Sequence, residues 1–177
     1  MATKQPPVKL IGEEKLRRNF SLLNALVQTK VKDIVNKHAQ NIVNEAKRKT
    51  PVDMGGLRAS IRASFYQNKM TAEVGTNSNY GAFVEFGTGP LGRQTNTNPL
   101  PSSYQHGPGG FFPPLQVIRD WCRRHKIPES AAFVIARKIG RNGMKARPFL
   151  YPAFLSVHTE FWKDLKQAVP EAAEKLE

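Results

Sequence analysis

Cysteine is almost absent from this chain of 177 residues. Cys122 is the only one, so the sequence excludes a disulfide within the chain and a zinc site built from several cysteines. No apolar run approaches the roughly 18 residues that a membrane-spanning helix needs, and the segment before Val8 contains no apolar core of a secretory signal. We therefore expect no membrane partner, and synthesis in a reducing cytoplasm.

Acidic residues are scarce as well. Asp and Glu total 14 against 27 Lys and Arg, which gives a net charge of +13. An excess of this size favours acidic partners, either a nucleic acid or an acidic protein surface. The basic run that ends at Lys126 makes Arg123, Arg124 and Lys126 candidate contacts for DNA or an acidic partner. The alternative is that this run is simply a solvated helix face.

Patterns that indicate catalysis are missing too. The four histidines show no metal-ligand spacing, and no two carboxylates stand out as an acid–base pair. Residues 87–92 fit G-x-G-x-x-G, but the polar, proline-rich sequence after them does not predict the helix that a dinucleotide loop must open. Cys122 and His125 share a predicted helix, where a core role explains the thiol. We predict a protein that is not an enzyme and that has no cofactor and no metal.

The periodicity of apolar residues predicts an α+β fold. Residues 13–49 contain neither proline nor glycine and repeat apolar residues every three to five positions, which indicates one long helix. Residues 57–66 alternate apolar and polar side chains, as a half-buried strand does, and residues 70–74 supply its hairpin partner. Residues 80–86 fit either a third strand or a short helical turn. Further helices are predicted over 114–126, 129–139 and 152–167, with Pro170 separating a frayed tail.

Two parts of the predicted organisation depart from a plain core. Residues 1–12 are expected to form an extended arm before a single α+β domain over 13–177. Within that domain, an extended loop over 89–112 precedes a helical insertion over 113–143. The loop has few apolar residues, so we expect it to become ordered only against another subunit or protein, with Tyr104, Phe111 and Phe112 as anchors. The alternative is a loop that packs on its own domain.

Three short motifs follow one another along the chain. The first is TPVDMGGLRASI at 50–61, the second joins VGT at 74–76 to YGAFVEFGT at 80–88, and the third is ARPFLYPA at 146–153. In this order they resemble the minor virion proteins that join head to tail in long-tailed double-stranded-DNA bacteriophages, called neck, head–tail connector or tail-completion proteins. Met54 and Gly81 stand where the family usually has Thr and Ala. The resemblance covers about residues 35–165.

The resemblance implies a non-enzymatic structural protein of the virion neck, synthesised in the host cytoplasm. It implies a long helix and a C-terminal helix packed on a small antiparallel sheet, and assembly as a cyclic homo-oligomeric ring between adjacent head-completion or adaptor proteins and the tail. Non-specific contact with genomic DNA in the channel would fit the basic charge. Two alternatives stay open: a basic nucleic-acid-binding module, and a tail terminator or other tail component. We expect the free chain to be monomeric or heterogeneous and to close into a ring only on its neighbour.

Two charged residues lie inside apolar motifs: Glu85 in the second and Arg147 in the third. Such flanks indicate burial, and a buried carboxylate is rarely left unpaired. We predict that Glu85 accepts hydrogen bonds from Arg147, or from Arg58 or Arg62 on the polar face of the predicted strand. This contact would lock the C-terminal connector against the sheet. The alternative is a solvated Glu85 that points outward.

Overall fold

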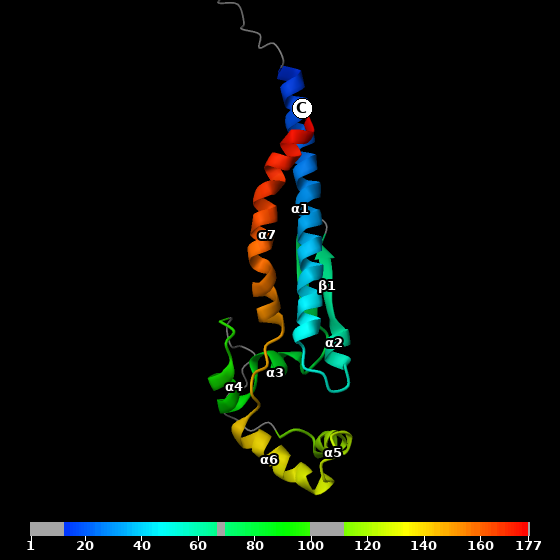
Figure 1. The fold of residues 1–177 in the computed structure, drawn as a ribbon, viewed down its shortest axis with the longest axis vertical. Coiled ribbons are helices and arrows are strands. Elements are labelled where there is room, and N and C mark those ends of the chain that lie inside the picture. Colours follow the sequence, from blue (N-terminus) through cyan, green and yellow to red (C-terminus); the bar gives the residue numbers. More distant parts are fainter. Residues whose placement is uncertain (1–12, 67–69, 100–111, 177) are drawn as a thin grey trace, which may run out of the picture.

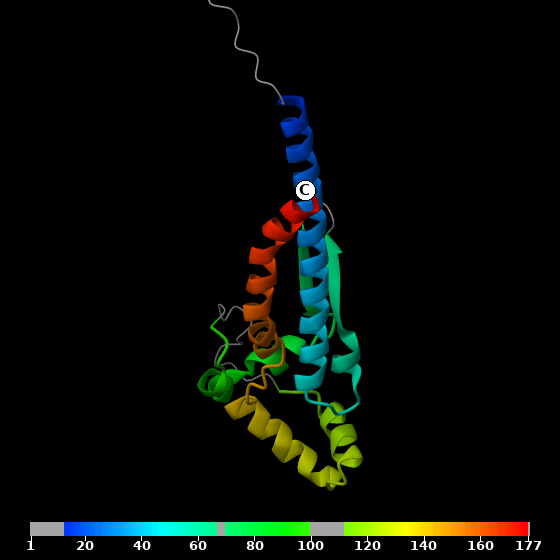
Figure 2. The same ribbon diagram turned by 45° about the horizontal axis from the view of Figure 1, so that its top comes forward.

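The computed structural model describes residues 13–66, 70–99 and 112–176, and it confirms the α+β class. The molecule is long and narrow (Figure 1). Helix α1 (Glu13–Lys49) and helix α7 (Leu150–Ala173) run antiparallel and pack along each other. A two-stranded sheet packs against α1. Helices α3 (Gly81–Phe86), α4 (Gly89–Thr95), α5 (Leu115–Arg124) and α6 (Ala132–Asn142) gather at the end of the molecule that is remote from the C-terminus (Figure 2).

Helix α1 has the bounds that its sequence predicts. It ends where Thr50 donates its hydroxyl to the carbonyl of Ala46, and Pro51 prevents a further turn. The residues of α1 that face the core, Ala39, Val43 and Ala46, are buried.

The predicted strand over 57–66 is wrong in its first half. Gly56–Ser60 forms a short helix, α2, and strand β1 begins only at Ile61 and runs to Tyr66. Strand β2 (Thr71–Thr76) pairs with it in antiparallel register, Ile61 opposite Thr76 and Tyr66 opposite Thr71. A left-handed φ of 81° at Gly55 starts α2, a conformation that glycine adopts without strain.

The structure settles residues 80–86 as helical. Gly81–Phe86 forms helix α3, and Gly89–Thr95 forms helix α4 inside the segment predicted to be an extended loop. Pro90 occupies the first turn of α4, where a missing N–H costs nothing.

The helical insertion has a small core of its own. It contains helix α5 (Leu115–Arg124), a short 3₁₀ turn (Glu129–Ala131) and helix α6 (Ala132–Asn142). Cys122 is fully buried in this core, together with Ile118, Ala132 and Ala136. The thiol therefore has the core role that the sequence suggested.

Helix α7 is longer than its sequence predicts. It starts at Leu150 and continues through Pro170 to Ala173, so the expected break at Pro170 is wrong. Ala168 and Ala172 are buried on either side of the proline, and this packing holds the last turns in place.

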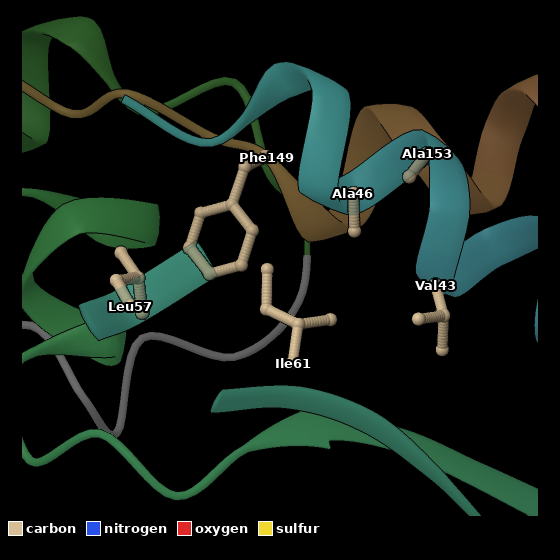
Figure 3. Packing of buried hydrophobic residues seen from close by; sticks show 6 residues of the cluster. All are labelled: Val43, Ala46, Leu57, Ile61, Phe149 and Ala153. Carbon is tan, nitrogen blue, oxygen red and sulfur yellow. The ribbon is translucent and has the colours of Figure 1, made fainter. Parts of the chain in front are cut away.

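The main core is where the three sequence motifs meet (Figure 3). Leu57 and Ile61 come from the first motif, and Phe149 and Ala153 come from the third. The six residues drawn in Figure 3 form the buried cluster: Val43, Ala46, Leu57, Ile61, Phe149 and Ala153. Val84 of the second motif packs against this cluster.

Candidate functional site

Among the described residues, Glu85 is the one buried carboxylate, and its side chain joins the second motif to the third. The residue is 4% exposed. Its Oε2 accepts hydrogen bonds from the main-chain N–H groups of Phe149 (2.7 Å) and Leu150 (2.9 Å), and its Oε1 accepts one from Tyr151 (2.9 Å). The side-chain amide of Asn98 donates to Oε1 at 3.3 Å. We call these groups the Glu85 junction.

The Glu85 junction supplies hydrogen-bond acceptors for the N-terminal N–H groups of α7. The first N–H groups of a helix have no partners within it, and the N-cap residue usually provides one. The N-cap of α7 is Phe149, which has no capping side chain. A carboxylate from α3 takes that place, and the partial positive charge at a helix N-terminus favours an anion there.

The prediction that Glu85 pairs with an arginine is wrong. Within the described residues, no ion pair joins Glu85 to Arg58, Arg62 or Arg147, and all three side chains are exposed. Main-chain amides and Asn98 fill the acceptor positions instead. Arg147 does lie beside the site, through its main-chain N–H, which donates to the carbonyl of Val84 at 2.8 Å. Burial of Glu85 and its contact with the C-terminal connector are as predicted; the partner is different.

An apolar groove of about 670 Å³ borders the Glu85 junction, between β2, α3 and α7. Ile42, Val74 and Phe154 are among its lining residues. Glu85 is the only acidic residue in this lining, and both of its oxygens accept the hydrogen bonds described above. Its described lining is therefore mainly apolar.

The segment 89–143 leaves the rest of the chain after Thr88 and rejoins it at Met144, and these two residues lie side by side. Thr88 and Met144 exchange main-chain hydrogen bonds of 2.9 and 3.1 Å, and the Thr88 hydroxyl accepts a further one from Met144 at 2.8 Å. The main chain of Gly143 lies so close that an added Cβ would fall 1.8 Å from the Thr88 carbonyl oxygen. We call this contact the stem: the segment 89–143, which includes α4 and the helical insertion, begins and ends beside two hydrogen-bonded residues, Thr88 and Met144.

The basic run predicted to contact DNA or an acidic partner is largely paired within the chain. Arg124 donates to Asp53 at 2.7 Å and His125 lies 3.0 Å from the same carboxylate, so the pKa of Asp53 is held below its usual value, chiefly by Arg124. Arg123 pairs with Asp120 (3.2 Å) and with Glu129, whose nearest contact is 2.9 Å. Lys126 is exposed beside them. The two contacts with Asp53 hold the end of α5 against the loop of the first motif.

The proposed loop anchors are only partly visible. Tyr104 and Phe111 lie outside the described residues. Phe112 is 56% exposed, and its ring lies against Gly140 of α6. Its observed contact is therefore with its own chain.

Two residues that matter at these sites were missed by the sequence reasoning. Asn98 lies in a polar stretch that gives no sign of a buried amide, although it is 8% exposed. Asp53 lies within the first motif, and this position is the one sequence signal for its contacts with Arg124 and His125.

Two negative findings apply to the described residues. No group of three or more His, Cys, Asp or Glu side chains is placed so that it could hold a metal ion. Among the helices in this part of the chain, none is both long and apolar enough to cross a membrane.

Comparison with known proteins adds one match. Residues 14–87 match the family described as "Bacteriophage HK97-gp10, putative tail-component". The matched segment contains the first motif and all of the second except Thr88, and Glu85 within it accepts hydrogen bonds from the third motif, which lies beyond it. No curated protein and no solved structure matches the chain. The match supports a tail-related structural component of a phage virion. Residues 14–87 are thus similar to a bacteriophage tail-component family, in agreement with the resemblance that the motifs indicate.

Proposed function

We propose that this protein is a structural subunit of the phage neck and that its copies form a closed ring that joins the DNA-filled head to the tail. The family match supports the virion context. Copies related by rotation would use two different surfaces per contact, as closed rings do. The neighbours would be the head-completion or adaptor proteins on one side and the tail on the other.

The observation that carries the proposal is the exposure of large apolar side chains along a narrow molecule. Leu16 (58%) and Phe20 (62%) lie near the start of α1, and Phe133 (62%) and Val134 (65%) lie on α6 at the opposite end. Clustered exposed apolar side chains mark protein interfaces. The two-stranded sheet of the described residues also has unpaired edges, which can accept a neighbouring strand.

Removing the gene from the phage tests the proposal. Without a neck subunit, filled heads and separate tails of normal length should accumulate in the lysate, and the protein supplied from a plasmid should restore joined particles. Electron microscopy of the lysate gives the result. Joined particles without the protein would contradict a neck role. Tails of irregular length would instead place its action in the tail, as in the tail-terminator alternative.

Two double variants, each with two substitutions, make the same test specific to the surface of α1. Leu16→Ser with Phe20→Ser removes apolar contact, and Glu14→Ser with Arg18→Ser changes two exposed charged residues on the same turns. The first pair should fail to restore joined particles and the second should restore them. Equal restoration by both would show that the start of α1 is not an assembly surface.

A further inference from the structure

Within the described residues, a group of basic side chains without acidic partners lies on α6 and the connector after it. Residues 130–159 contain no Asp or Glu, and they contain five Lys or Arg residues. All five are exposed, and no ion pair to an acidic residue is found for any of them within the described residues. We define these residues as the α6 basic ridge: Arg137, Lys138, Arg141, Lys145 and Arg147.

The acidic residues of the insertion do not neutralise this ridge. Residues 89–143 contain eight Lys or Arg and two acidic residues. Both acids, Asp120 and Glu129, are engaged by Arg123 of α5. The charge of the α6 basic ridge is therefore directed to solvent or to a partner, whereas the basic run at 123–126 is largely satisfied within the chain.

The ridge also has a shape that suits a phosphate backbone. Arg137, Lys138 and Arg141 are one and four residues apart, so they share one face of α6, while Ala132 and Ala136 pack into the insertion core. Arg137 and Arg141 are about 6 Å apart along the helix axis, from a rise of 1.5 Å per residue. Alternate phosphates on one DNA strand are separated by about 7 Å along the duplex axis.

Lys145 and Arg147 extend the same charge along the connector. Together with Lys138 they line a cleft of about 440 Å³ next to the stem of the insertion. The stem fixes the connector against Thr88, so these cations are held near α6 by main-chain hydrogen bonds.

We propose that the α6 basic ridge binds the phosphate backbone of duplex DNA without sequence preference. Long basic side chains on an exposed helix face supply point charges for phosphates and no base-specific pattern. The proposal rests on the charges and their pairing, and it stands whether or not the protein occupies the neck.

Fluorescence anisotropy with a labelled 30-bp duplex of arbitrary sequence tests the proposal on the full chain. Wild-type protein should bind at low salt, and its affinity should fall steeply as salt rises. Replacing Arg137, Lys138 and Arg141 together by Gln should weaken binding at least about tenfold at 0.1 M salt and lower the slope of log K against log salt by about 2–3. A duplex of different sequence should bind equally.

The matched control replaces Lys163, Lys166 and Lys175 by Gln, which removes the same charge from exposed positions on and after α7. This control should bind DNA almost as tightly as wild type, and unchanged circular dichroism of both variants would exclude misfolding. Equal weakening by both triple variants would show that binding depends only on the net charge of the protein, and it would overturn the proposal that the α6 basic ridge is the binding site. Absence of binding at 50 mM salt would also overturn the proposal and assign the ridge to an acidic protein, for which Phe133 and Val134 on the same helix would add apolar contact.

Discussion

Glu85 is a buried charged residue beside the cluster of apolar side chains that forms the main core. Burial of a carboxylate is costly unless its oxygens are satisfied. Here three main-chain N–H groups and one side-chain amide satisfy them. Those N–H groups are donors at the start of α7 that have no partner within the helix. The same hydrogen bonds therefore stabilise both the buried carboxylate and the N-terminus of α7.

Substituting Glu85 should therefore be costly. Glu85→Ala leaves the amides of Phe149 and Leu150 without an acceptor and should lower the free energy of unfolding by about 3 kcal/mol. Glu85→Gln keeps one acceptor oxygen and should cost about half as much. Urea unfolding measures both, and Asn98→Ala, which removes the 3.3 Å contact but leaves the three main-chain donors in place, serves as the comparison. An alanine variant within 0.5 kcal/mol of wild type, a margin typical of surface substitutions, would show that the junction does not stabilise α7.

The hydrogen bonds of the Asp164 carboxylate predict how the free energy of unfolding changes at acid pH. Its carboxylate accepts from Lys37 at 2.8 Å and lies 2.9 Å from His38, and the hydrogen bond from Lys37, followed by that from His38, holds its pKa below the ordinary 3.8. A pKa lowered by folding means that the stabilisation is present above about pH 4 and is lost as pH falls through the folded-state value.

The corresponding measurement is the free energy of unfolding at a series of pH values. Wild type should lose stability below about pH 4, and Asp164→Asn should be less stable at neutral pH and lose less on acidification. Glu174→Gln changes an exposed acid at the C-terminal end of the same helix, α7, and is the control. Parallel acid curves for wild type and Asp164→Asn would contradict this assignment.

At the scale of elements, the long helix with a regular apolar pattern was predictable and the short helices α2 and α4 were not. Helix α1 follows from an uninterrupted apolar repeat without proline or glycine. Helix α2 was hidden because its few residues fit an alternating pattern as well as a helical turn. Helix α4 contains Gly89, Pro90 and Gly92, a composition that favours loops; its contacts with Gly87 and the Ala146 main chain hold it in place.

The candidate site was predictable in part for a similar reason. Apolar neighbours indicated that Glu85 is buried, and its motif indicated contact with the third motif. Its partners are main-chain N–H groups, which every residue except proline has and which leave no trace in the sequence. Side-chain chemistry alone therefore pointed to arginine.

The close packing of the stem predicts that Gly143 cannot be replaced without a large loss of stability. Gly143 has φ 79° and ψ −166°, a region that is essentially restricted to glycine, and an added Cβ would meet the Thr88 carbonyl. Gly143→Ala should cost at least about 3 kcal/mol in free energy of unfolding. Gly55 has φ 81° with open space around it, so Gly55→Ala should cost only about 1–2 kcal/mol. Equal costs in urea unfolding would mean that the stem is not tightly packed.

The same stem predicts that the insertion can be removed. Because Thr88 and Met144 are hydrogen-bonded neighbours, joining them through two glycines in place of residues 89–143 should leave a body that unfolds cooperatively. Its stability should be lower, since Asn98 and Arg124 no longer contact Glu85 and Asp53. Circular dichroism during urea unfolding measures this. A broad transition without cooperativity would show that the insertion is part of the main core.

At the scale of the whole molecule, the protein is a thin body with apolar side chains exposed at both ends. A subunit that closed into a ring before meeting its neighbour would compete with assembly on the particle. We therefore predict a monomer or a heterogeneous mixture in free solution, as measured by light scattering coupled to size exclusion. A single stable closed ring of the purified protein would contradict this prediction.

The most direct test of the neck assignment is an electron cryomicroscopy map of the virions that contain this protein. Our proposal predicts a closed ring of copies at the head–tail junction, with the α1–α7 pair recognisable as two long antiparallel helices in each copy. Density for the chain along the tail or at its tip, or absence of the protein from mature particles, would contradict the assignment.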